Sequence, residues 1–159
     1  MKEDKGFDTA LEVCMITPNV LFVDDDCHVL SAFQRLFRKF FVIDTALGGM
    51  VGLKVVSERG PFSVIVSDLK MPGMDGIQFL SQVWRIAPES MRIILTGNAC
   101  LKNVIAGLNE GVISCFLTKP CEPEVLRENI SSAIQRHKAG CAKAISGKNF
   151  CLRDPRQRR

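Results

Sequence analysis

Five short apolar runs, each followed by a segment with helical periodicity, constrain the fold of this chain more than any other feature of its sequence. The runs cover about 19–23, 41–46, 64–67, 92–95 and 112–117. Strands that alternate with helices pair in parallel, because each helix returns the chain across the sheet by a right-handed crossover. The sequence therefore predicts an α/β fold, a doubly wound (βα)5 parallel sheet with the flavodoxin-like strand order 2-1-3-4-5.

Start and stop signals bound the helical segments between these runs. Asp75 has the short carboxylate favoured at a helix N-cap, and the helix that follows it stops before Pro88. Gly111 ends the next helix, and Pro123 suits the first turn of the last one. We therefore expect helices over about 29–40, 48–59, 76–87, 101–110 and 123–137.

A single domain accounts for the 159 residues, because a hydrophobic fraction of 47% suffices for one ordinary core. We divide the chain into a flexible leader (1–18), the α/β domain (19–137) and a basic tail or severed linker (138–159). The tail carries seven Lys and Arg against one Asp, and its charge of +6 leaves −2 for residues 1–137. Nucleic acid is therefore not expected as the ligand of the domain.

Hydropathy and cysteine usage indicate the compartment. No apolar segment approaches the roughly 20 residues that cross a bilayer, and the first residues lack the order of a signal peptide. We therefore expect a cytoplasmic protein. The seven cysteines are odd in number and form no Cys-x-x-Cys pair, so neither a disulfide framework nor a zinc site is expected. His28 is interpreted as a solvated residue in the first turn of a helix.

Polar residues follow four of the five apolar runs. Asp24 and Asp25 end the first run, Asp68 the third, Thr96 the fourth and Lys119 the fifth. The carboxyl ends of parallel strands meet at one edge of a sheet, and strands one, three, four and five are neighbours in the predicted order. These five side chains can therefore share a pocket.

The chemistry of this pocket suits a hard divalent cation and a phosphoryl group. Carboxylate oxygens without a sulfur or imidazole partner favour Mg²⁺, which keeps several waters and binds phosphate oxygens. An aspartate such as Asp68 can attack phosphorus and form an acyl phosphate. The Lys119 ammonium and the Thr96 hydroxyl are suited to hold the phosphoryl oxygens.

Four motifs in this order resemble those of the receiver domain of two-component response regulators. They are Val23-Asp24-Asp25-Asp26, Asp68-Leu69-Lys70-Met71-Pro72-Gly73-Met74-Asp75-Gly76, Leu95-Thr96-Gly97 and Phe116-Leu117-Thr118-Lys119-Pro120. The resemblance covers about residues 19–137. The sequence around Phe116 is similar to that of receiver domains joined to cyclic-dinucleotide phosphodiesterase outputs.

The resemblance implies a role for each acid of the pocket. Asp68 would be the phosphoacceptor, taking a phosphoryl group from a histidine kinase or a phosphotransfer protein. Asp25, Asp68 and the backbone carbonyl of Lys70 would hold Mg²⁺, with Asp24 acting mostly through a bound water. Phosphorylation and dephosphorylation at Asp68 would be self-catalysed, and the chain would not otherwise be an enzyme.

The resemblance also implies a switch. Lys119 would pair with Asp68 or with its phosphoryl group, and Lys119-Pro120 would be a cis peptide. Thr96 would turn inward to the phosphoryl oxygen, and Phe116 would follow it to a buried rotamer. The surface of the fourth helix, fifth strand and fifth helix would then change, and an output domain, a partner protein or a second copy would read that change.

Two other functions remain open on the residues alone. A Mg²⁺-dependent aspartyl phosphohydrolase generally needs a second acid two residues after the nucleophile, and Lys70 occupies that position. A flavin-binding module on the same fold needs a phosphate-binding loop after the first strand, but three acids stand there. Both alternatives are therefore disfavoured.

Overall fold

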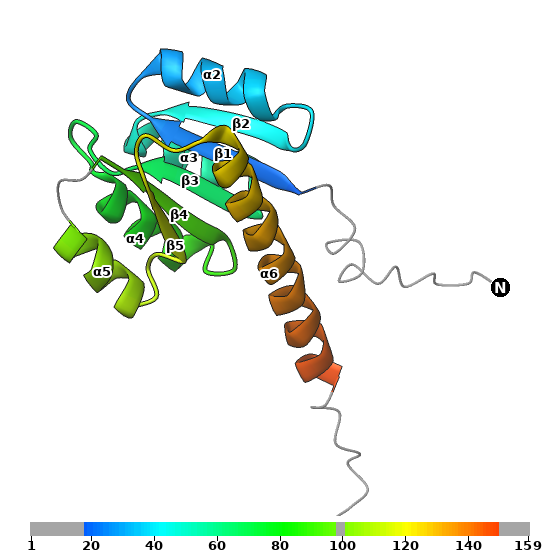
Figure 1. Cartoon of the computed structure of the whole chain (residues 1–159). Helices are drawn as coiled ribbons and strands as arrows, with labels where there is room; N and C mark the ends of the chain where they lie inside the picture. The colour runs from blue at the N-terminus through cyan, green and yellow to red at the C-terminus, as the bar shows by residue number, and fades with distance from the viewer. Residues whose placement is uncertain (1–17, 98–100, 150–159) are drawn as a thin grey trace, which may run out of the picture.

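The computed structural model describes residues 18–97 and 101–149, and the side chains of 18–97 and 101–143. Its five strands form one parallel sheet in the order β2-β1-β3-β4-β5, as the sequence predicts. The strands are β1 (Asn19–Asp24), β2 (Val42–Leu47), β3 (Val64–Asp68), β4 (Met91–Thr96) and β5 (Cys115–Thr118). Figure 1 shows β3 near the middle of this twisted sheet.

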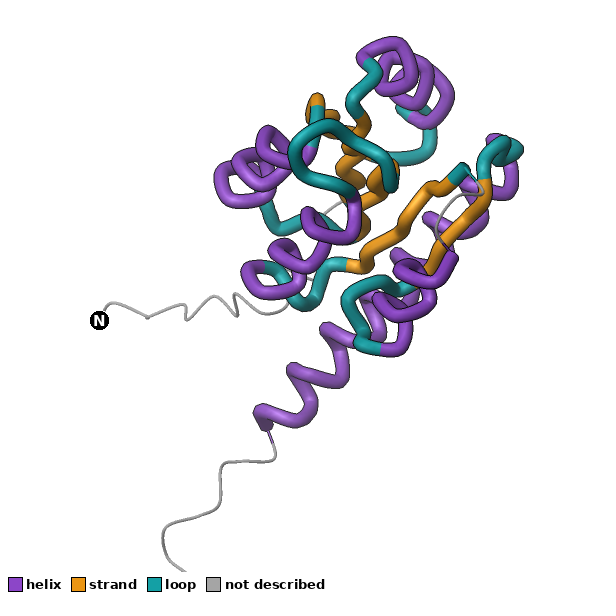
Figure 2. Tube along the Cα trace, turned by 90° about the vertical axis from the view of Figure 1, so that its left-hand side faces the viewer, coloured by secondary structure: helices purple, strands orange, loops and turns teal. Residues whose placement is uncertain are grey.

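Helices cover both faces of the sheet (Figure 2). They are α2 (Cys27–Phe37), α3 (Gly49–Arg59), α4 (Gly76–Ile86), α5 (Leu101–Asn109) and α6 (Pro123–Asn149). One core cluster joins the sheet to α3, α4 and α5 through residues such as Val56, Phe79 and Val104. The other joins it to α2 and α6 through residues such as Phe37 and Ile130. Among the described residues, no helix combines the length and apolar character needed to cross a bilayer.

The central strands are apolar along their whole length because both of their faces are covered. In β1, Leu21 and Val23 belong to the cluster under α3, α4 and α5, whereas Val20 and Phe22 belong to the cluster under α2 and α6. All four side chains are at most 2% exposed. This alternation fixes the register, so the polar residues that end β1, β3, β4 and β5 lie at defined places on the sheet edge.

The start of β5 differs from the prediction. The apolar run begins at Val112, but the strand begins at Cys115, because the first part of the run completes the end of α5 instead. The backbone N–H of Ile113 donates to Gly107 O at 3.1 Å, and Val112 and Ile113 are buried against the helices. Pairing with β4 starts only after Ser114 N–H donates to Arg92 O.

The last helix is longer than the sequence predicts. We expected it to end near His137, but α6 continues to Asn149. Its first half packs on the sheet through Leu126, Ile130 and neighbouring residues, and its second half extends past the sheet (Figure 1). Gly140 does not end the helix, since the Ala- and Lys-rich sequence around it favours helix without packing. The remainder of the predicted tail, 150–159, and most of the predicted leader, 1–17, lie outside the described residues.

Candidate functional site

The structure brings the predicted acids together at the carboxyl edge of the sheet. Asp24 ends β1, Asp25 follows it, and Asp68 ends β3, the strand that pairs with β1. One carboxylate oxygen from each of the three residues lies within 4.8 Å of the others. Asp24 is buried, Asp68 is half-buried and Asp25 is exposed, so the group forms a pocket that opens to solvent at Asp25.

Lys119 supplies the cation of this pocket. Its Nζ donates a hydrogen bond to Asp68 Oδ1 at 2.9 Å and lies 3.6 Å from Asp24 Oδ2. Burial alone would lower the pKa of Lys119, but the two carboxylates outweigh it and raise the pKa above its ordinary value. Lys119 is therefore a fixed positive charge between the two acids.

Asp24 is the acid with the least favourable surroundings. Its residue is 3% exposed, and its Oδ1 accepts a hydrogen bond from Asp26 N at 2.9 Å. Its Oδ2 is the one buried side-chain polar atom among the described residues without a hydrogen-bond partner. Burial raises the pKa of Asp24, although the Asp26 N–H and Lys119 oppose this effect. A buried carboxylate oxygen left without a donor suits a bound cation or its water.

The turn after β3 fixes the backbone of Asp68. Ser67 Oγ donates to Asp68 O at 2.9 Å, and Gly76 N–H donates to Leu69 O at 2.8 Å. A Cβ on Gly76 would lie 2.2 Å from Asp68 O, so only glycine allows this close approach. The Asp-Gly pair predicts a turn, but neither Ser67 nor Gly76 is identified from sequence as a support of the site.

Helix caps account for two further acids near the pocket. Asp75 caps α4 as predicted: its Oδ1 accepts from Gln78 N, and Gln78 Oε1 accepts from Asp75 N. Asp26 caps α2, because its Oδ1 accepts from His28 N at 2.8 Å. Asp26 thus differs from Asp24 and Asp25, which face the pocket.

The predicted switch residues lie on β4 and β5, the two strands on one side of β3. Thr96, at the end of β4, is 1% exposed, and its carbonyl oxygen accepts the Lys119 N–H at 2.7 Å. Phe116, in β5, is half-buried against the core cluster under α3, α4 and α5. The Lys119-Pro120 peptide is cis, in agreement with the resemblance. Lys70 is exposed on the turn after β3.

The chain is similar to known proteins both in sequence and in structure. The family model described as "Response regulator receiver domain" matches residues 20–131. The chain is 31% identical over 123 residues to the hydrogenase transcriptional regulatory protein HoxA of Bradyrhizobium diazoefficiens, covering 77% of this chain and 25% of that protein. The chain thus spans about a quarter of the length of the curated relatives that it matches first.

Solved structures agree with this family. A response regulator receiver domain protein from Clostridium thermocellum is 31% identical, with a TM-score of 0.73 over 77% of this chain and 98% of that one. A structure described as adenylate cyclase from Rhodopirellula baltica is 32% identical, with a TM-score of 0.81 over 84% of this chain and 98% of that one. The phosphohydrolase and flavin-binding alternatives find no support in these comparisons.

The sheet order, the acids at the ends of β1 and β3, and the lysine after β5 are the features that the sequence motifs predicted. The matched family covers the strands that carry all of them. The chain therefore belongs to the response regulator receiver domain family, the phosphoacceptor domains of two-component signalling.

Proposed function

We propose that Asp68 is the phosphoacceptor of this chain and receives its phosphoryl group from a histidine kinase or a phosphotransfer protein. The observation that carries the proposal is the position of Asp68 at the end of β3, hydrogen-bonded to Lys119 and facing Asp24 and Asp25. The half-buried carboxylate keeps access to solvent, which a nucleophile for an incoming phosphoryl group needs.

Asp25, Asp68 and the backbone carbonyl of Lys70 hold Mg²⁺ in this proposal, and Asp24 acts mostly through a bound water. The oxygen-only donor set and the unsatisfied Asp24 Oδ2 support this assignment. When bound, Mg²⁺ supplies positive charge that offsets the charge of the phosphoryl oxygens.

The chain's own residues then carry the transfer. An oxygen of Asp68 attacks phosphorus, the P–N bond of the donor phosphohistidine breaks, and the imidazole leaves with the electron pair. Lys119 moves its hydrogen bond from the Asp68 carboxylate to a phosphoryl oxygen, so the charge added at the site meets a cation already in place. Thr96 donates its hydroxyl to another phosphoryl oxygen. Loss of the group by attack of water on phosphorus is self-catalysed at the same site.

The signal leaves through the surface formed by α5, β5 and α6. Thr96 pairs with Thr118 on β5, two residues from Phe116, so a movement of Thr96 is passed to β5 directly. Leu101, Ile105 and Val125 are 43%, 49% and 44% exposed on this surface. An output domain, a partner protein or a second copy of the chain that binds one state of this surface reads the signal.

Incubation with acetyl phosphate or phosphoramidate and Mg²⁺, followed by intact-mass measurement, tests the proposal. We expect a gain of one phosphoryl group, none with Asp68→Asn, and an unchanged gain with Asp44→Asn, which removes a carboxylate paired with Arg59 outside the pocket. Absence of the adduct in the wild type, together with no binding of beryllium fluoride, would overturn it.

The division of the chain follows the same proposal. Residues 19–137 form the receiver domain, and 138–159 form a basic segment or linker whose first part continues α6. The cytoplasmic location stays a prediction from the sequence. By analogy with the relatives, a longer protein that contains this domain would be a two-component regulator with an output domain.

A further inference from the structure

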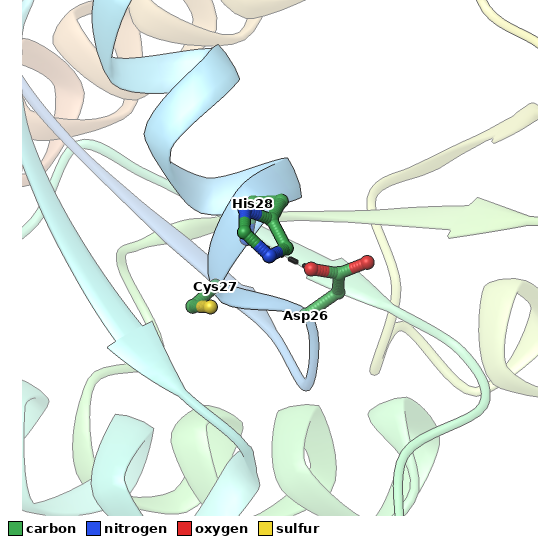
Figure 3. A group of neighbouring side chains, drawn as sticks. All are labelled: Asp26, Cys27 and His28. Carbon is green, nitrogen blue, oxygen red and sulfur yellow. Dashed lines mark hydrogen bonds between the residues drawn. The ribbon is translucent and has the colours of Figure 1, made fainter.

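Three consecutive residues at the start of α2 offer three different metal-binding atoms. Asp26 carries a carboxylate, Cys27 a thiol and His28 an imidazole, and one such atom from each lies within 4.8 Å of the others. All three residues are exposed, and Cys27 forms no disulfide. Figure 3 shows the three side chains around the first turn of α2, with the Asp26 carboxylate turned toward His28.

The N-cap hydrogen bond fixes the position of one of the three metal-binding groups, the Asp26 carboxylate. Asp26 Oδ1 accepts from the backbone N–H of His28, which holds the carboxylate over the first turn of α2. A tetrahedral metal with ligands at about 2.0–2.3 Å places those ligands about 3.3–3.8 Å apart. The observed limit of 4.8 Å therefore requires an inward movement of about 1 Å, which exposed side chains can make by rotation.

The donor set selects a different metal from that of the acid pocket. Asp24, Asp25 and Asp68 offer oxygen alone, which suits Mg²⁺. A thiolate, an imidazole and a carboxylate together suit Zn²⁺, which is softer and accepts four ligands of mixed type. The two groups share no residue, although Asp26 directly follows Asp25 in the chain. The cysteine spacing does not predict a zinc site, because the Cys-x-x-Cys criterion detects pairs of cysteines. It does not detect a Cys-His pair beside an acid.

We propose that Asp26, Cys27 and His28 form a Zn²⁺ site at the amino end of α2, with the fourth position open to water or to a ligand from outside. None of the three ligands belongs to the acid pocket of Asp24, Asp25 and Asp68. Zn²⁺ there lies one residue from Asp25 along the chain, and two divalent cations so close repel each other. Occupancy of the zinc site therefore weakens binding of Mg²⁺ by the neighbouring acids, which makes the zinc level an inhibitory input to the receiver.

Titration of the full metal-free chain with Zn²⁺, under reduction by a phosphine, measures the site by calorimetry. Co²⁺ in place of Zn²⁺ reports the ligands, since a Cys–Co²⁺ bond gives a charge-transfer band and a tetrahedral site gives strong visible bands. We expect binding of one equivalent and a Cys-dependent band. Cys27→Ser and His28→Gln each weaken binding at least tenfold, and Asp44→Asn, which lies outside both groups, leaves it unchanged.

Two matched variants guard against other thiols. Cys121→Ser removes a half-buried thiol elsewhere, and His137→Gln removes the imidazole whose Nε2 lies 3.9 Å from Cys141 Sγ. Both variants keep the wild-type Zn²⁺ affinity and the wild-type Co²⁺ charge-transfer band if the proposal is correct. A charge-transfer band that survives Cys27→Ser, a band lost in His137→Gln, or no binding of Zn²⁺ at micromolar concentration would each overturn it.

A second titration, with Mg²⁺ in the presence and absence of Zn²⁺, tests the inhibition. We expect Zn²⁺ to lower the Mg²⁺ affinity several-fold in the wild type and to leave it unchanged in Cys27→Ser.

Discussion

The Lys119 ammonium lies 3.6 Å from Asp24 Oδ2, a buried oxygen that accepts no hydrogen bond from the described residues. The same ammonium donates its hydrogen bond to Asp68, 2.9 Å away. Lys119 is thus shared between two carboxylates and donates a hydrogen bond to one of them, Asp68. The ionised carboxylate of Asp24 consequently lowers the stability of the fold. Such a loss of stability is expected where residues are arranged to bind a ligand.

Asp24→Asn should stabilise the metal-free protein at neutral pH, because the substitution removes a charge that burial disfavours. Burial raises the pKa of Asp24 above 3.8, so the folded state binds its proton more tightly than the unfolded state. The wild type therefore loses stability as pH rises from the ordinary pKa of Asp24 in the unfolded chain to its raised pKa in the folded protein. Above the raised pKa, the loss is complete. Urea unfolding of both proteins across this interval measures the difference, which should shrink toward acid pH.

Mg²⁺ should reverse the order of stability of these two proteins. The wild type gains stability from the bound ion by mass action, whereas Asp24→Asn gains less. Asp44→Asn serves as the control, because its exposed pair with Arg59 contributes little and its removal changes stability by less than about 0.5 kcal/mol. A wild type more stable than Asp24→Asn without metal would contradict the argument.

Lys119→Met should slow formation of the phosphoryl adduct by about 10²-fold. The substitution keeps much of the side-chain volume and removes the cation that faces Asp68 and Asp24. The pKa of Lys119 is raised, so its charge also stabilises the fold at every pH below the ordinary pKa of 10.5, and the variant should unfold at lower urea. Adduct formation is followed by mass, with Lys54→Met, an exposed lysine of α3, expected to match the wild type.

Gly76→Ala should destabilise the protein by about 1–3 kcal/mol through overpacking. The added Cβ would lie 2.2 Å from Asp68 O and 3.0 Å from Ile94 Cδ1, and the backbone carbonyl cannot move without displacing Asp68, the proposed phosphoacceptor. Gly140→Ala is the matched control, because nothing lies within 4 Å of its added Cβ in α6 and alanine favours helix by about 0.5–1 kcal/mol. Thermal unfolding of the two variants should therefore shift in opposite directions.

His137→Gln should flatten the dependence of stability on pH below about pH 6.5. Burial lowers the pKa of His137, although Glu89 opposes the shift, and its Nε2 lies 3.9 Å from Cys141 Sγ. The unfolded chain therefore takes up this proton first, and wild-type stability is lost as pH falls from 6.5 to the lowered pKa. Urea midpoints at about pH 7.5 and about pH 5.5 measure the effect. Identical slopes for the two proteins would contradict it.

The strand order and the site could be predicted because both depend on the ends of apolar runs. Runs such as 64–67 are buried on both faces, so they can only be central strands. Once these strands are parallel, Asp24, Asp68 and Lys119 must meet at one edge, whatever the details of the loops between them.

Contacts between backbone and side chain could not be predicted in the same way. Arg92 stands at the start of an apolar run, and nothing in the sequence indicates that its guanidinium is buried and donates to the carbonyls of Pro88, Ser90, Gly111 and Val112. The end of α6 was also predicted too early, because the loss of apolar periodicity marks where a helix stops packing and not where it stops.

The length of α6 allows a small rotation of its packed half to move its far end by a larger distance. Ile134 is its last deeply buried residue in the core, and the helix continues to Asn149, which at 1.5 Å per residue is about 22 Å further. A helix of this length is stiff, so a tilt of about 10° at its packed half displaces its far end by about 4 Å. Small movements of the packed half of α6 are therefore enlarged at its far end, about 22 Å beyond Ile134.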